Sequence, residues 1–237
     1  MRRFYKVVSV AREGDAFTVT LDGKKMRTRA KAPFHLPNEA LARAIANEWE
    51  DQGSTIKPQS MPITRLAGTA IDRVSPARSR VIDELAAYGE TDLLCHRADR
   101  PAELVTRQDT AWRPLLDWAA QKYSADLKVT IGILPQPQPK QALAALRGAV
   151  AGFDDMMLAG LHSATTASGS LIIGLALAEG RIDAAGAFEI SQVDETFQIE
   201  RWGEDAELEE QRAGIRADME STAIFIRFLS DQGAKGG

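Results

Sequence analysis

The stretch FTVTLDGKKMRT, residues 17–28, has the pattern of a β-hairpin. Apolar and polar residues alternate from Phe17 to Leu21, which is the period of a strand with one buried face. Asp22-Gly23 then supplies the left-handed residues of a tight turn, so the chain is expected to return as a second strand. The preceding segment 4–10 is rich in aromatic and β-branched residues. We therefore predict that a β-meander opens the protein.

From Pro58 onward the hydrophobic spacing becomes helical almost without interruption. Beyond residue 140, helices are expected over residues 141–150, 154–162, 170–178, 184–199 and about 204–230. The predicted fold class is α+β. We expect a β-rich N-terminal domain with one helix over residues 1–58, and a larger, mainly helical C-terminal domain over residues 59–237.

The single helix of the N-terminal domain is expected to follow the start signal Pro37-Asn38. Leu41, Ile45 and Trp49 recur at intervals of four residues, so they share one face of this helix. We assign these three residues a structural role in the core.

Length, composition and charge exclude several classes of protein. The chain has 237 residues, of which 44% are hydrophobic and 26% charged, as in soluble globular proteins. The formal net charge of -4 argues against a nucleic-acid partner. A single cysteine, Cys95, excludes an internal disulfide and fits a reducing compartment. No apolar run reaches the roughly 20 residues of a membrane span, so stable membrane insertion is not expected.

Known catalytic motifs are absent from the sequence. No phosphate-binding glycine loop occurs, and the three histidines are too far apart for a zinc-binding HExxH pair. Cys95-His96 is a candidate nucleophile and base, but adjacent residues generally point apart. The alternative is a buried thiol beside a structural histidine. We expect neither a metal nor a cofactor.

Acidic residues dominate the segment from Asp194 to Glu220, where ten carboxylates face three arginines. The pairs Asp194-Glu195 and Glu204-Asp205 could perform acid–base chemistry or bind calcium, although neither has the loop spacing of an EF-hand. The segment is otherwise interpreted as a solvated helix face or as an acidic docking surface. Trp202, between the two pairs, is either a packing residue or a binding residue.

The sequence also resembles a known family in blocks that follow one another from about Arg3 to Phe228. The likeness is carried by Arg3-Phe4-Tyr5-Lys6, Leu21-Asp22-Gly23-Lys24 with Arg27-Thr28, Glu48-Trp49-Glu50-Asp51-Gln52, Met61-Pro62-Ile63-Thr64-Arg65-Leu66, Thr69-Ala70-Ile71-Asp72, Thr91-Asp92-Leu93-Leu94-Cys95-His96-Arg97, Gln108-Asp109-Thr110-Ala111-Trp112-Arg113-Pro114-Leu115-Leu116, Asp194-Glu195-Thr196-Phe197-Gln198 and Trp202-Gly203-Glu204-Asp205. These blocks resemble those of the assembly chaperones of the F-type ATP synthase catalytic head that bind its α subunit. That family is found in mitochondria and alphaproteobacteria.

The resemblance implies a two-domain α+β protein without enzymatic activity. Its client would be the unassembled α subunit of the F-type ATP synthase, kept from aggregating until the β subunit pairs with it. The resemblance also implies client-binding roles for Asp194 and Glu195 and, in the block that follows, for Trp202, Glu204 and Asp205. The free protein is expected to be a monomer.

Two alternatives remain open. One is a small cytosolic hydrolase or transferase that uses Cys95-His96 or the carboxylates of residues 194 and 195. The other is a scaffold that remains in the finished synthase. A chaperone differs from the first by co-purifying with a stoichiometric protein, and from the second by leaving the mature complex. No amphipathic presequence precedes Arg3, which favours a bacterial cytoplasm over the mitochondrial matrix of eukaryotic relatives.

Overall fold

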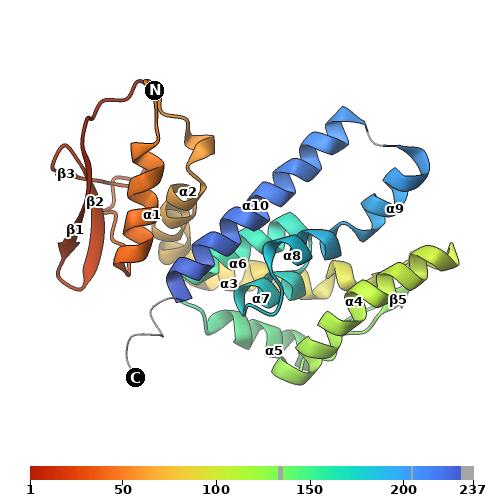
Figure 1. The fold of residues 1–237 in the computed structure, drawn as a ribbon. Helices are drawn as coiled ribbons and strands as arrows, with labels where there is room; N and C mark the ends of the chain where they lie inside the picture. Colours follow the sequence, from red (N-terminus) through yellow and green to blue (C-terminus); the bar gives the residue numbers. More distant parts are fainter. Residues whose placement is uncertain (133–135, 204, 231–237) are drawn as a thin grey trace. The chain divides into compact units, whose positions relative to one another are not determined.

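The computed structural model describes residues 1–132, 136–203 and 205–230, and its fold class is α+β, as the sequence predicts (Figure 1). Three strands form an antiparallel sheet in the order β1-β2-β3, and two further strands, β4 and β5, form a parallel pair. The strands are β1 Val8–Glu13, β2 Ala16–Leu21, β3 Lys24–Lys25, β4 His96–Arg97 and β5 Thr130–Ile131.

The N-terminal sheet confirms the predicted β-meander. Asp22 and Gly23 have φ angles of 50° and 77°, the left-handed conformation that a tight hairpin turn requires. The first strand begins at Val8, later than the predicted residue 4. The reason is that the Asp22 carboxylate accepts hydrogen bonds from the backbone N–H groups of Lys6 and Val7, at 3.0 and 2.9 Å, in place of a strand partner.

Helices form most of the remaining structure. They are α1 Glu39–Glu50, α2 Pro62–Thr69, α3 Arg78–Ala87, α4 Ala102–Tyr123, α5 Lys140–Ala151, α6 Asp155–Ser168, α7 Leu171–Ala178, α8 Ala184–Ser191, α9 Val193–Trp202 and α10 Ala206–Ser230. As predicted, Asn38 begins α1, because its side chain accepts a hydrogen bond from the Leu41 N–H. Between α2 and α3 the backbone continues through a π-helical segment, Ala70–Val74, and a 3₁₀ segment, Ser75–Ala77.

The single helix predicted over 184–199 is wrong, because the chain forms two helices there. Gln192 separates α8 from α9 with φ and ψ angles of -111° and 21°. Its backbone N–H donates a 3.1 Å hydrogen bond to the Phe188 carbonyl at the end of α8, and its carbonyl accepts a 2.8 Å hydrogen bond from the Thr196 N–H at the start of α9. Its side-chain oxygen accepts a hydrogen bond from Arg212 of α10. A hydrophobic period cannot reveal such a break, since the apolar spacing continues through it.

The chain divides into two compact units, each made of more than one segment. The first unit comprises Met1–Arg78, Asp155–Gly160 and Ser221–Gly237, and the second comprises Ser79–Asp154 and Leu161–Glu220. Helices α6 and α10 each contribute residues to both units. The domain boundary predicted at residue 58 lies inside the first of these units, and it stays a prediction about which part folds on its own.

The core of the first unit joins the sheet to helices. Leu41 and Ile45 of α1 are fully buried in it, and Trp49 packs against it while partly exposed. Phe225, at 0% exposure, comes from the C-terminal part of α10. The Asn38 side chain also donates a 2.7 Å hydrogen bond to the carbonyl of Phe228. The unit therefore combines residues that are 190 positions apart in the sequence.

The core of the second unit is built around α7, whose eight residues are all buried. Asp92, which is 0% exposed, accepts hydrogen bonds from Ser170 Oγ at 2.6 Å and from the Ile172 N–H at 3.1 Å, so one carboxylate holds the start of this helix. Although α7 is strongly apolar, it is far too short to span a bilayer. Within the described part of the chain, no helix is both long and apolar enough to cross a membrane.

Candidate functional site

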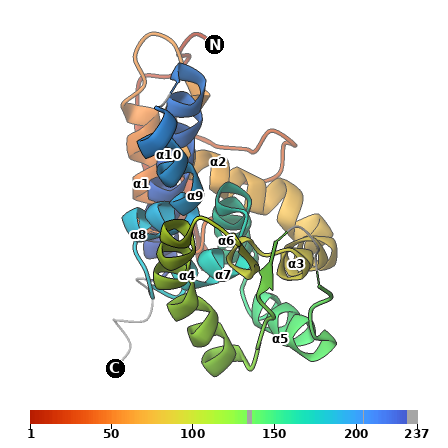
Figure 2. The same cartoon turned by 90° about the vertical axis from the view of Figure 1, so that its right-hand side faces the viewer.

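The acidic pair Asp194 and Glu195 lies in the first turn of α9, where the helix dipole favours negative charge. Helix α9 packs against α4 (Figures 1 and 2). Phe197, 3% exposed, lies beneath two guanidinium groups, Arg107 at 5.3 Å and Arg201 at 4.3 Å from its ring centre. These contacts fix which side of α9 faces α4.

Asp194 is partly buried and bonded to α4. Its Oδ1 accepts a 2.7 Å hydrogen bond from Nε2 of Gln108, a side chain that is only 1% exposed. The other end of the Gln108 amide, Oε1, accepts a 2.9 Å hydrogen bond from the backbone N–H of Ala98, directly after β4. A buried amide thus connects the end of a strand to the first turn of α9.

Arg97 of β4, the residue before Ala98, has a buried guanidinium group. Its side chain is 7% exposed and its guanidinium carbon lies 4.9 Å from the ring centre of Trp112, a cation–π contact. Its terminal nitrogens, Nη1 and Nη2, are buried and have no hydrogen-bond partner among the described residues. Burial lowers the pKa of Arg97, while the charges of Asp109 and Asp194 oppose that shift. Its positive charge therefore acts on both carboxylates without a direct ion pair.

Glu195 and Trp202 lie on a different side of α9 from the packed Phe197. They are seven residues apart, almost two full helical turns, so their side chains project from the same face. Trp202 is 77% exposed, which places it on the surface and not in the packing role that was one of its two interpretations. This face of α9 presents a carboxylate and an aromatic ring together.

The remaining two predicted site residues follow α9. The Oδ1 atom of Asp205 accepts a 2.8 Å hydrogen bond from the Leu208 N–H, so this carboxylate caps the start of α10. Its predicted binding role stays a prediction. Glu204 lies outside the described residues.

The candidate nucleophile Cys95 lacks the environment of a reactive thiol. It is 1% exposed, and burial, together with the negative charge of Asp92, raises its pKa to about 12. No hydrogen bond joins its sulfur to His96 within the described chain. A thiol that stays protonated near neutral pH is a poor nucleophile, so the hydrolase or transferase alternative is not favoured.

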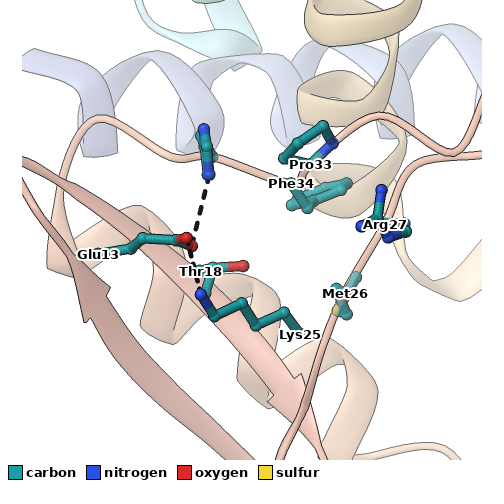
Figure 3. Close-up of a pocket in the computed structure, with 8 residues that line it drawn as sticks. Glu13, Thr18, Lys25, Met26, Arg27, Pro33 and Phe34 are labelled. Carbon is teal, nitrogen blue, oxygen red and sulfur yellow. Dashed lines mark hydrogen bonds and ion pairs between the residues drawn. The ribbon is translucent and has the colours of Figure 1, made fainter.

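A small cavity of about 210 Å³ lies in the first unit, between the hairpin and the segment after it (Figure 3). Glu13 contacts Lys25 at 2.7 Å and His35 at 3.4 Å at its rim, while Met26 and Phe34 contribute apolar walls. The hydrogen bond from Lys25 lowers the pKa of Glu13. The lining holds neither a serine nor a cysteine nucleophile. In the described residues, no group of three or more possible metal ligands occurs.

No sequence pattern predicts a role for Arg97 or Gln108. Both lie inside blocks quoted for the family resemblance, Thr91 to Arg97 and Gln108 to Leu116, and that was their only signal. Their relation to Asp194 depends on a contact across 86 residues of sequence, which no local pattern reports.

Comparisons with known proteins identify the family. Residues 2–120 match the ATP12 chaperone protein family. The mitochondrial protein atp12 of Schizosaccharomyces pombe is 24% identical, with 97% of this chain and 84% of the relative covered. The crystal structure of Atp12 from Paracoccus denitrificans is 45% identical with a TM-score of 0.92, covering 96% of this chain and 97% of that one, and an aspartate-to-lysine mutant of it gives the same values. The Atu1473 protein of Agrobacterium tumefaciens is 38% identical with a TM-score of 0.92, covering 97% of this chain and 86% of that one. The chain therefore belongs to the ATP12 chaperone family.

Proposed function

We propose that this assembly chaperone of the F-type ATP synthase binds the unassembled α subunit and prevents its aggregation until the β subunit replaces the chaperone. Similarity to members of this family over nearly the whole chain is the observation that carries the proposal. A newly made subunit exposes the apolar surface that belongs at its interface with the next subunit, and such surface aggregates. Covering it requires reversible binding and no chemical step.

The binding surface that we propose is the first turn and outer face of α9. Asp194 and Glu195 make no ion pair within the described residues, so their charges remain available to a basic group of the client. The exposed Trp202 on the same helix adds the kind of aromatic anchor that dominates many interfaces. Asp205, at the start of α10, extends the proposed surface, and the client-binding role of Glu204 stays a prediction.

The setting that we propose is the bacterial cytoplasm, with a chaperone that is monomeric when free. A net charge of -4 fits a protein client with a basic patch better than nucleic acid. The N-terminal region is basic and the segment after Asp194 is acidic, so the first would attract acidic groups of a partner and the second would attract basic groups.

Co-expression with the ATP synthase α subunit tests the client. The α subunit should become soluble and elute with the chaperone in size-exclusion chromatography, and addition of the β subunit should displace the chaperone. An α subunit that stays insoluble in the presence of folded chaperone would contradict the proposal. Retention of the chaperone in the assembled enzyme would favour the scaffold alternative instead.

Charge reversal tests the surface. Asp194→Lys with Glu195→Lys should weaken binding of the α subunit at least about tenfold, because a lost and reversed charge contact at an interface costs several kcal/mol. Wild-type binding should also weaken as salt rises. The matched control is Glu209→Lys with Glu210→Lys, an equal change of charge at exposed positions of α10. Equal binding by the two double variants would show that net charge, and not the α9 surface, is recognised.

A further inference from the structure

We propose that Gln108 is a positioning residue, which holds Asp194 in the orientation that meets the client. The inference rests on the proposed role of Asp194 in client binding and adds a buried residue of α4 to the machinery. Gln108 itself is 1% exposed, so it can act on a client only through the carboxylate it holds.

The orientation of the Gln108 amide is dictated by its two partners. A backbone N–H can only donate a hydrogen bond, and an ionised carboxylate can only accept one. The amide oxygen must therefore face Ala98 and the amide nitrogen must face Asp194, and a flipped amide would lose both bonds. The arrangement therefore fixes one orientation of the amide and one position of the Asp194 Oδ1 atom.

Asp194 would otherwise have a nearer partner. It lies in the first turn of α9, where free N–H groups usually bind an acidic side chain, and the N-cap residue Gln192 makes no side-chain cap bond. The Asp194 side chain nevertheless extends to α4. Its second oxygen, Oδ2, has no partner among the described residues, so it is the atom left to face a client.

A neutral amide holds this carboxylate without cancelling its charge. Three other carboxylates on the same two helices are ion-paired: Glu103 with Arg107 and Arg201, Glu200 with Arg107, and Asp109 with Arg113. Asp194 is held by Gln108 instead, although the buried Arg97 lies close enough for its charge to be felt. A carboxylate fixed before binding loses less side-chain freedom when it meets its partner.

A matched pair of glutamine variants tests the inference. Gln138, 9% exposed, also uses both amide atoms, bonding to the backbone N–H and carbonyl of Lys128 at 2.8 and 2.9 Å. Gln108→Met and Gln138→Met each remove both hydrogen bonds of a buried amide at nearly constant volume. We expect similar losses of thermal stability, but only Gln108→Met should weaken binding of the α subunit, by about fivefold, since it alone frees Asp194. Equal binding by both folded variants would overturn the inference.

Moving the negative charge from residue 194 to residue 108 separates the effect of charge position on binding from any effect on folding. Gln108→Glu places two carboxylates against each other, whereas Gln108→Glu combined with Asp194→Asn restores an amide–carboxylate hydrogen bond and the wild-type net charge. The combined variant should recover thermal stability relative to Gln108→Glu and still bind the α subunit about tenfold more weakly than wild type, because the charge now lies inside the protein. Normal binding by this variant would overturn the inference.

These experiments distinguish a wrong proposed function from a wrong positioning role for Gln108. In that case the wild-type chain itself does not bind the α subunit, and the glutamine variants have no binding to lose. A wild-type chain that binds, together with a Gln108→Met variant that binds equally well, refutes only the positioning role.

Discussion

The Trp49 side chain contacts the rest of the first unit through its ring, and its indole N–H makes no hydrogen bond among the described residues. Its ring lies 5.6 Å from that of Tyr5 and packs against the core of the first unit, while the Tyr5 hydroxyl donates a 2.6 Å hydrogen bond to the Trp49 carbonyl. The indole Nε1–H is buried without a partner among the described residues. The ring, and not its N–H, is therefore expected to stabilise the fold.

Two substitutions at Trp49 separate these contributions. Trp49→Ala should lower the free energy of unfolding by about 3 kcal/mol, the lower end for a large aromatic residue, because the ring is partly exposed. Trp49→Phe should stay within about 1 kcal/mol of wild type, since no hydrogen bond is lost. Urea denaturation measures both. An unchanged Trp49→Ala would show that the ring belongs to a binding surface.

Cys95 should be chemically inert in the folded protein. With its pKa raised to about 12 by burial, the thiol stays protonated at pH 8, whereas the thiol of the unfolded chain ionises near its ordinary pKa of about 8.5. Reaction with a thiol reagent at pH 8 should be at least about a hundredfold slower in native protein than in denaturant. Cys95→Ser should retain α-subunit binding. Rapid native labelling, or loss of function in a folded Cys95→Ser variant, would revive the enzyme alternative.

At the scale of elements, hydrogen bonds to Glu48 connect α1 to the start of α2. Its carboxylate accepts hydrogen bonds from the N–H groups of Ile63 and Thr64, both at 2.7 Å, and from Thr64 Oγ1 at 2.6 Å. Met61, at the N-cap of α2, makes no side-chain cap bond, so Glu48 replaces the missing local cap. Burial raises the pKa of Glu48 even though these hydrogen bonds lower it.

This raised pKa has a definite consequence for stability against pH. Between the unfolded and the folded pKa of Glu48, the folded protein binds more protons, so the unfolding free energy falls as pH rises. The wild-type chain should therefore lose stability relative to Glu48→Gln between about pH 4 and neutrality. Urea denaturation across this range measures the difference, and Glu50→Gln controls for removing a carboxylate from α1. A wild-type chain that gains stability relative to Glu48→Gln would show that the hydrogen bonds outweigh burial.

At the scale of the whole molecule, the two ends of the chain build one core. The buried cluster around β2 and α1 takes Ile63 and Ala67 from α2 and Phe225 from α10, all beyond residue 58. A fragment of residues 1–58 leaves these neighbours behind and exposes the apolar face that they cover. A sheet of three short strands with one helix has little core of its own.

We therefore expect the 1–58 fragment to lack a cooperative unfolding transition in circular dichroism, whereas the full chain should show one. Removing residues 221–237 from the full chain should also lower its stability, because Phe225 is lost from the cluster. A cooperative transition in the 1–58 fragment would establish it as an independent domain, as the sequence alone suggests.

Short-range features of this protein were set by the sequence itself. The strand over residues 17–21, the Asp22-Gly23 turn and the Asn38 cap act between residues a few positions apart, so their patterns can be read directly and were confirmed. The expectation of a single buried face was wrong, because Thr18 and Thr20 are buried as well as Val19 and Leu21. The blocks resembling the chaperone family also revealed the family from sequence alone. The acidic pair was expected inside one helix over 184–199, whereas the structure places it in the first turn of α9, because the backbone leaves the helical path at Gln192.

Only the tertiary structure decided how distant residues meet. Gln108 and Asp194 are 86 positions apart, and Asn38 reaches the Phe228 carbonyl across 190 positions. Arg97 is buried with its guanidinium carbon 4.9 Å from the ring centre of Trp112, a residue of another element. Such contacts depend on how helices pack, and hydrophobic periodicity states only that a face is buried, not which face it meets. The chain thus specifies its elements locally, while the surroundings of Asp194 arise from packing between them.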